Sequence, residues 1–276
     1  MYIQPADAPK RKPVRVPGLR AMKARGEKIA VLTCYDASFA AQMEAAGVDV
    51  ALVGDSLGMV VQGNPSTLPV TLDQMVYHTS LVARGLDATL LIADLPFMQF
   101  RDPATALAAS GRLMAEGGAA MVKLEGGSEW VCEVIAALAS HDVPVCAHLG
   151  LTPQSVHKMG GYRMQGKTDD AAARLRDQAQ AVARAGAELL VLESIPAAQA
   201  GEISRALPIP TIGIGAGAEC DGQVLVCYDL LGLTPGRRPK FSKDFLAGRG
   251  SVREAFAAYA EDVRAGRFPG PEQIAG

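Results

Sequence analysis

The sequence of 276 residues lacks the features that mark membrane, secreted and nucleic-acid-binding proteins. No apolar run approaches the ~18 residues that a membrane-spanning helix requires. Lys and Arg number 27 against 29 Asp and Glu, and this near-neutral, mixed balance argues against nucleic acid or an anionic membrane as the main partner. The N-terminal stretch carries several basic residues among prolines without an apolar segment, so a signal peptide is not expected.

Cysteine is sparse and shows no pattern. The 5 cysteines are an odd number and contain no Cys-x-x-Cys spacing, so a disulfide framework is not indicated. Reduced thiols in a cytoplasmic protein are the simplest expectation.

Short apolar runs that end on an acidic residue recur along the chain. Runs of this length, rich in branched side chains, are typical of strands that are buried on both faces. Four of them end at Asp55, Asp94, Glu125 and Glu193. Four further strands are expected, which makes eight in all. In chain order they are 28–33, 49–53, 90–94, 119–125, 143–148, one that ends at 193, 210–214 and 223–227.

Helical patterns alternate with these strands. Asp36, the capping box Thr71-x-x-Gln74 and the pair Asp102-Pro103 each mark a helix start, and 252–263 carries a single apolar stripe. This alternation, in a chain close to the ~250 residues that one barrel needs, predicts an α/β fold, a closed (β/α)8 TIM barrel. We expect an N-terminal arm over 1–16, one catalytic barrel over 17–276, and a short helix over 16–25 across one end.

Three segments between the predicted strands and helices have sequences that can indicate function. The segment 150–168 is expected to be long and irregular, and loops of that length in a compact domain are usually functional. Gly213–Ala218 formally matches G-x-G-x-x-A, but it follows the seventh strand, so a nicotinamide site is not expected there. A glycine-lined anion loop and tight helix–strand packing are both compatible with it. The basic run 235–240 fits a solvated loop or a contact with an acidic ligand tail.

In a barrel of this type the functional site lies at the carboxyl ends of the strands. That rule alone gathers seven polar side chains, which are Asp55, Ser56, Asp94, Lys123, Glu125, His148 and Glu193. Several carboxylates at one mouth repel one another unless a cation neutralises them. Oxygen ligands without a Cys or His pair favour a hard divalent ion such as Mg²⁺ over structural zinc.

Taken singly, each of these residues has a structural interpretation. Asp55, Asp94 and Ser56 could cap the helices that follow them, and Glu193 could do the same. Lys123 and Glu125 could form a structural ion pair, and His148 could be a core histidine with satisfied hydrogen bonds. Their predicted position at one end of the barrel is what favours a shared functional site.

Five motifs in order resemble the ketopantoate hydroxymethyltransferase family. They are Gly54–Met59, Ala93–Phe97, Lys123–Gly127, His148–Gln154, and Thr211–Gly217 followed by Cys220–Gln223. The resemblance extends from about residue 33 to 243. It implies a barrel of the phosphoenolpyruvate/pyruvate superfamily, usually assembled as a homodecamer. The implied reaction, in pantothenate and coenzyme A biosynthesis, transfers a hydroxymethyl group from methylenetetrahydrofolate to 3-methyl-2-oxobutanoate through a Mg-stabilised enolate and gives ketopantoate and tetrahydrofolate.

The resemblance also implies roles for individual residues. Asp55 and Asp94 would bind Mg²⁺, and Glu125 would complete its shell through water. Asp55, Ser56, Asp94 and Lys123 would hold the keto acid. Glu193 would accept the proton, and His148 would lie beside the pocket.

Two other hypotheses remain open on the sequence. A carbon–carbon lyase or mutase of the same superfamily would act on a different 2-keto acid, but the Lys-Lys-Cys-Gly-His loop common in those enzymes is absent from the chain. A barrel that only binds a keto acid would not need Glu193 as a base.

Overall fold

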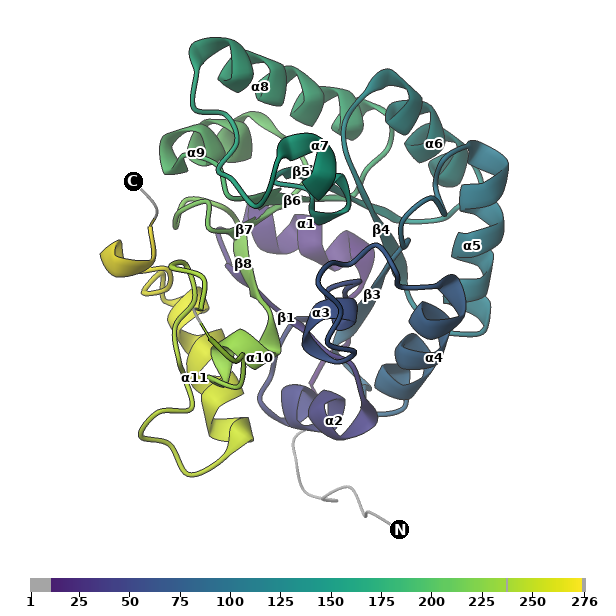
Figure 1. Cartoon of the computed structure of the whole chain (residues 1–276). Coiled ribbons are helices and arrows are strands. Elements are labelled where there is room, and N and C mark those ends of the chain that lie inside the picture. Colours follow the sequence, from purple (N-terminus) through teal and green to yellow (C-terminus); the bar gives the residue numbers. More distant parts are fainter. Residues whose placement is uncertain (1–10, 237, 275–276) are drawn as a thin grey trace.

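The computed structural model describes residues 11–236 and 238–274. Its strands are all parallel and close into one barrel in the order β1 to β8 (Figure 1). They are β1 Ile29–Thr33, β2 Val50–Val53, β3 Leu90–Asp94, β4 Met121–Glu125, β5 Val145–Gly150, β6 Leu189–Glu193, β7 Thr211–Ile214 and β8 Gly222–Leu225. The predicted fold class, a (β/α)8 barrel, is confirmed.

Helices connect the strands and cover the barrel from outside (Figure 1). They are α1 Val16–Ala24, α2 Ala37–Ala45, α3 Leu57–Val60, α4 Leu72–Ala83, α5 Pro103–Ala115, α6 Glu129–Ser140, α7 Val156–Met159, α8 Asp169–Arg184, α9 Ala197–Ala206, α10 Cys227–Leu230 and α11 Val252–Arg264, with short 3₁₀ turns at Pro153–Ser155 and Pro271–Gln273. The predicted caps form, because the side chains of Asp36, Thr71 and Asp102 each accept a hydrogen bond from a backbone N–H of the first helical turn.

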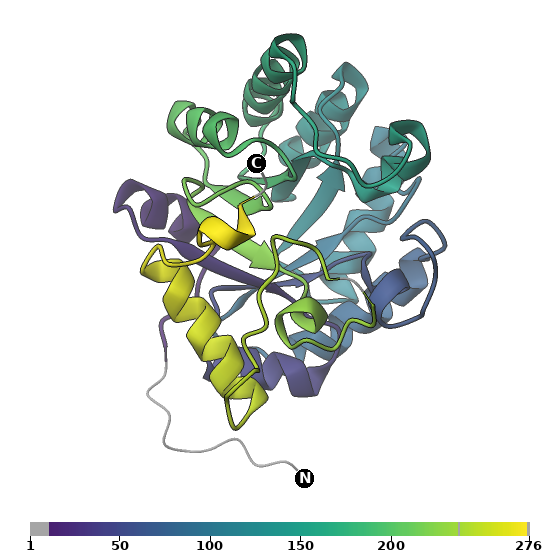
Figure 2. The same ribbon diagram turned by 60° about the vertical axis from the view of Figure 1, so that its left-hand side comes forward.

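Alternate residues of each strand point into the barrel, and this period of two separates two hydrophobic clusters. The inner cluster contains Ile29, Val50, Leu90 and their inward-facing neighbours. The outer cluster lies between the strands and the surrounding helices. The last helix belongs to the outer layer, where α11 packs against α2 and β1 (Figure 2).

Helix α1 covers the amino-terminal end of the barrel, as expected for residues 16–25. Its Leu19 is fully buried and belongs to the inner cluster with the first inward residues of the strands. Lys23 fixes the helix from the polar side, since its Nζ donates to the Asp221 carboxylate at 2.7 Å and to the Ser204 carbonyl. The opposite end of the barrel is therefore the one left for a ligand.

The described part of the predicted arm lies against the barrel, contrary to a loose segment. Arg11 donates to the carbonyls of Gly47 and Val48 and to the Thr89 hydroxyl, and the N–H of Val14 donates to the Ala88 carbonyl. Residues 1–10 of the arm, and Arg237 in the basic run, lie outside the described residues.

The segment 150–168 is more regular than expected. It contains the 3₁₀ turn and helix α7, which ends at Gly160 in the left-handed conformation. Helices α3 and α10 were also not predicted, because helices of 4 residues carry no apolar periodicity that a sequence pattern could reveal. The three short helices α3, α7 and α10 all lie at the carboxyl ends of the strands.

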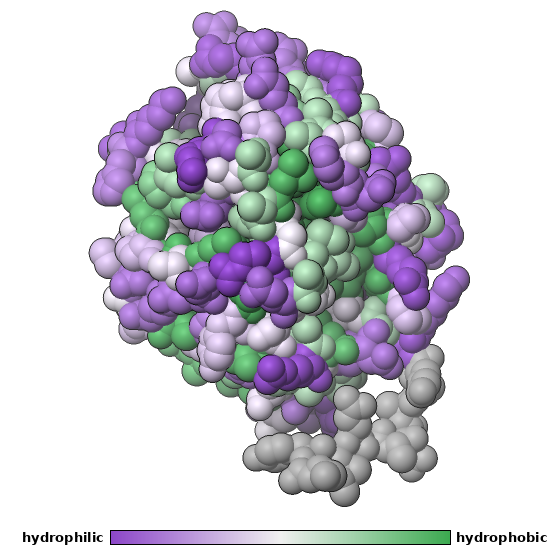
Figure 3. All heavy atoms as spheres, turned by 90° about the vertical axis from the view of Figure 1, so that its right-hand side faces the viewer, coloured by the Kyte–Doolittle hydropathy of each residue, from purple (hydrophilic) through white to green (hydrophobic). Residues whose placement is uncertain are grey.

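Among residues 11–236 and 238–274, no helix is both long and apolar enough to cross a bilayer. The face that carries α4, α5 and α6 mixes charged and apolar side chains (Figure 3). Exposed apolar residues from these elements and the loop before α5 are Tyr77, Phe97, Met98 and Trp130.

Replacing Leu19 by Ala tests the role of α1 in closing the barrel. Deleting a fully buried leucine side chain from a packed cluster costs about 2–5 kcal/mol. We expect Leu19→Ala to lower the free energy of unfolding in urea by that amount. Arg20→Ala, an exposed change in the same helix, should cost less than about 1 kcal/mol. Equal stabilities of the two variants would show that α1 does not seal the barrel.

Candidate functional site

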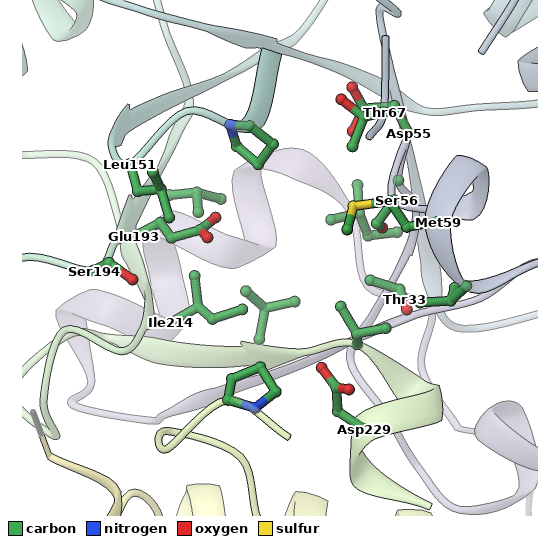
Figure 4. Close-up of a pocket in the computed structure, with 18 of the residues that line it drawn as sticks. Thr33, Asp55, Ser56, Met59, Thr67, Leu151, Glu193, Ser194, Ile214 and Asp229 are labelled. Atoms are coloured by element: carbon green, nitrogen blue, oxygen red, sulfur yellow. The ribbon is translucent and has the colours of Figure 1, made fainter. Parts of the chain in front are cut away.

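A cavity of about 620 Å³ opens at the carboxyl ends of the strands (Figure 4). All seven residues singled out in the sequence line it, namely Asp55, Ser56, Asp94, Lys123, Glu125, His148 and Glu193. The strand register explains their proximity. Lys123 pairs with Asp94 on one neighbour, Glu125 pairs with His148 on the other, and Glu193 pairs with Gly150.

Lys123 is a buried cation in the floor of the cavity. It follows Met121 at the inward positions of β4, so the strand period places its amine above the apolar inner cluster. Its Nζ lies 2.9 Å from Asp94 Oδ1, and both side chains are almost completely buried. Burial alone would lower the pKa of Lys123, but the charges of Asp94, Glu125 and Asp55 outweigh it and raise that pKa. The ammonium form is therefore held in place.

Asp55 and Glu125 are buried carboxyl groups that repel each other. Burial and the charge of Asp94 raise the pKa of Asp55 to about 7, with Lys123 and Gln154 opposing the rise. Burial and the charge of Asp55 likewise raise the pKa of Glu125 well above its usual value. One ammonium therefore does not fully compensate the negative charge of this group.

Gln154 connects these two carboxylates to the segment after β5. Its side-chain Nε2 donates to Asp55 Oδ2 at 2.9 Å and to the Leu95 carbonyl, and its backbone N–H donates to Glu125 Oε2 at 2.9 Å. Gln154 is the last residue of the motif His148–Gln154, but the sequence indicates no role for it. An uncharged amide carries no sign of function in a sequence, and the loop geometry that aims it could not be predicted.

His148 lies between two acids of the site. Its Nε2 is 3.2 Å from Glu193 Oε2, and its Nδ1 is 3.7 Å from Glu125 Oε1. Burial and the nearby Lys123 lower the pKa of His148, although the contact with Glu193 opposes this. The neutral imidazole is therefore the favoured form. The alternative of a core histidine with satisfied hydrogen bonds does not fit, because His148 lines the cavity and neither ring nitrogen has a hydrogen-bond partner among the described residues.

Glu193 differs from the other acids because its side chain reaches the open part of the cavity, where Figure 4 shows it pointing inward. Ser194, the next residue, has φ of +48°, a conformation that costs a non-glycine residue roughly 1–2 kcal/mol. Across from Glu193, Gly150 has φ of +93°, and a Cβ there would lie 2.2 Å from the Glu193 carbonyl oxygen. The backbone around Glu193 is thus closely constrained.

Ser56 is held by a residue that the sequence did not indicate. The Tyr35 and Ser56 hydroxyl groups lie 2.9 Å apart, and Tyr35 is buried. Its position directly after the core residue Cys34 gave no signal of a polar contact. The structure therefore adds Tyr35 to the site as a neighbour that can orient the Ser56 hydroxyl.

The donor set fits a hard divalent cation. Glu125 Oε1 is buried and has no hydrogen-bond partner among the described residues. Burial and mutual repulsion raise the pKa of both Asp55 and Glu125, so a cation between them would be stabilised. Within 11–236 and 238–274, no three or more Asp, Glu, His or Cys side chains are grouped so that they could hold a metal ion by themselves. Mg²⁺ keeps several waters and typically takes only one or two protein carboxylates, so this arrangement suits it.

The glycine motif after β7 is explained by packing. A Cβ at Gly217 would lie 2.5 Å from the Cβ of Ala197 at the start of α9. This contact supports the close helix–strand packing that the sequence left open.

Solved structures with the same fold are distant in sequence. Phosphoenolpyruvate phosphomutase from Streptomyces platensis subsp. rosaceus superposes with a TM-score of 0.61 at 16% identity, covering 79% of this chain and 83% of that one. A 2,3-dimethylmalate lyase of the PEP mutase/isocitrate lyase superfamily superposes with a TM-score of 0.57 at 18% identity, covering 79% and 82%. These superpositions show a shared fold.

Curated relatives are much closer. The 3-methyl-2-oxobutanoate hydroxymethyltransferase of Burkholderia thailandensis is 56% identical over 98% of both chains, and that of Burkholderia multivorans is 55% identical over the same shares. The family model for ketopantoate hydroxymethyltransferase matches residues 13–271. The chain therefore belongs to the ketopantoate hydroxymethyltransferase family and is a hydroxymethyltransferase enzyme.

Proposed function

We propose that the enzyme transfers a hydroxymethyl group from methylenetetrahydrofolate to 3-methyl-2-oxobutanoate and forms ketopantoate and tetrahydrofolate. The observation that carries this proposal is the pairing of a buried, charge-rich floor with the carboxylate of Glu193 directly above it. Asp55, Asp94, Glu125 and Lys123 form the floor, and Glu193 faces the cavity above it. Such a site suits removal of a proton next to a carbonyl group.

The keto acid would bind against the floor through its oxygen atoms. Lys123 offers a fixed positive charge to the carboxylate or the keto oxygen, and Ser56, oriented by Tyr35, offers a hydroxyl group. A small acid held in this way has its branched carbon directed away from the charged floor. That carbon carries the proton that must be removed.

Glu193 would take the proton from the branched carbon. The carbon–hydrogen electron pair then moves into the carbonyl group and creates negative charge on the keto oxygen, where Lys123 stabilises it. The nucleophilic carbon attacks the methylene carbon of the folate, and water supplies the hydroxyl oxygen of the product. Both carbon–nitrogen bonds of the methylene unit break, and the two nitrogens take up the proton removed by Glu193 and one proton of the water. Neutral His148, 3.2 Å from Glu193, would keep that carboxylate in position.

Asp55 and Asp94 would hold Mg²⁺, with Glu125 reaching it through water. When bound, the ion would supply Lewis-acid polarisation of the keto acid oxygens. Gln154 would hold Asp55 and Glu125 in the orientation that this requires.

Proton exchange tests the base assignment directly. With Mg²⁺ in D₂O and no folate, the parent enzyme should exchange the C3 proton of 3-methyl-2-oxobutanoate for deuterium, as followed by NMR. Glu193→Gln removes the base but keeps the shape, so the rate should fall about 10²-fold or more. Unchanged exchange in this variant would exclude Glu193 as the base. Absence of exchange in the parent, both without and with the folate, would exclude the proposed reaction.

We also propose a cytoplasmic location and assembly as a homodecamer. Exposed large apolar side chains on and beside α4 and α6, such as Tyr77 and Trp130, support association of copies, because their burial between copies is favourable. Light scattering after size exclusion should give the mass of a decamer, compared with 28.8 kDa for one chain. A monomer mass would contradict the assembly.

A further inference from the structure

A large part of the cavity is not needed by the keto acid. A volume of about 620 Å³ lies within the ~300–1,000 Å³ typical of sites for drug-sized ligands, whereas the keto acid is a small branched molecule. The charged floor occupies one side. The other side is lined by residues of the α7 and α10 regions and of the segment 234–241, for which the proposed reaction has so far assigned no role.

Asp229 is the buried acid on that second side. It belongs to α10, is only 6% exposed, and lines the cavity. Figure 4 shows its carboxylate directed into the cavity, across from Asp55 and Thr67. It is separate from the carboxylates of the floor, so it is not part of the proposed metal site.

The contacts of Asp229 leave one of its oxygen atoms facing the cavity. Thr234 donates its hydroxyl to Asp229 Oδ1 at 2.5 Å, and no described residue donates a hydrogen bond to Oδ2. Burial raises the pKa of Asp229, while Thr234 and the positive charge of Arg238 oppose the rise. A carboxylate in such a place is costly unless a ligand with N–H donors pairs with it.

The pterin ring of a reduced folate has the matching chemistry. Its pyrimidine edge carries an amino group beside a protonated ring nitrogen, and both are N–H donors to which the cavity-facing Oδ2 can offer a charged acceptor. The keto acid has no such donors. Asp229 thus offers an acceptor for a ligand of this kind on the side of the cavity away from the charged floor.

We propose that Asp229 binds the aminopyrimidine edge of the folate and defines the subsite for the second substrate. This inference rests on the proposed function and adds the residue that selects the one-carbon donor. Tyr162 and Phe241, which also line the cavity, supply apolar ring surfaces for the pterin. Lys240 and Arg238 line it as well and carry the charge that matches the carboxylates of the glutamate tail, and Arg238 also lies 3.3 Å from Asp244 Oδ2.

Asp229→Asn tests the subsite with little change of shape. The amide keeps an oxygen that can accept the Thr234 hydroxyl, but it loses the charge and one acceptor. Hydrogen bonds to a charged group are strong enough that we expect KM for methylenetetrahydrofolate to rise about tenfold to a hundredfold. KM for 3-methyl-2-oxobutanoate should change less than about threefold. Asp177→Asn, on the exposed surface of α8, is the matched control and should change neither value.

Thr234→Val provides a second variant, which removes the loop contact and keeps the carboxylate. If Asp229 acts only by anchoring this loop, Thr234→Val should raise the folate KM as much as Asp229→Asn does, and that result would overturn the proposal. An unchanged folate KM in Asp229→Asn would also overturn it.

The folate-free exchange of the C3 proton, measured on the same samples, distinguishes failure of the proposed folate subsite from failure of the proposed reaction. Exchange by the parent enzyme, together with an unchanged folate KM in Asp229→Asn, would reject the subsite alone. Failure of the parent enzyme to exchange with or without folate would reject the proposed function.

Discussion

The ion pair between Lys123 and Asp94 is the interaction on which the site depends. It places one ammonium group at the bottom of a mouth that also contains Asp55, Glu125 and Glu193. Burial prevents water from screening these charges, so the carboxyl groups compete for a single cation. Burial, together with the charge of Asp94, raises the pKa of Asp55 to about 7. The barrel itself supplies the rigidity that keeps the charges together.

The surrounding structure follows from this excess of negative charge. Gln154 brings two N–H donors to Asp55 and Glu125, and in doing so it attaches the segment after β5 to the floor of the cavity. His148 remains neutral between Glu125 and Glu193 and so adds no further charge. A second, separate acid, Asp229, lies across the cavity from this group.

The fold and the acids of the site on the strands could be predicted, because both follow from the regular alternation of apolar strands and helices. Apolar strands that end on acids place Asp94, Glu125 and Glu193 at the same end of a parallel barrel. The remaining site residues could not be predicted in this way. Gln154 and Asp229 lie on short helical turns whose direction is set by tertiary packing. Tyr35 contacts Ser56 from a position whose sequence pattern is typical of the core.

The central claim is that the excess negative charge of the floor forms a divalent cation site. Titration of the metal-free enzyme with Mn²⁺, followed by electron paramagnetic resonance, tests it most directly. The account predicts one site per chain in the parent and an affinity at least about tenfold weaker in Asp94→Asn, which keeps the size of the side chain but removes its charge. Equal affinity in the two proteins, or no binding to the parent, would contradict it.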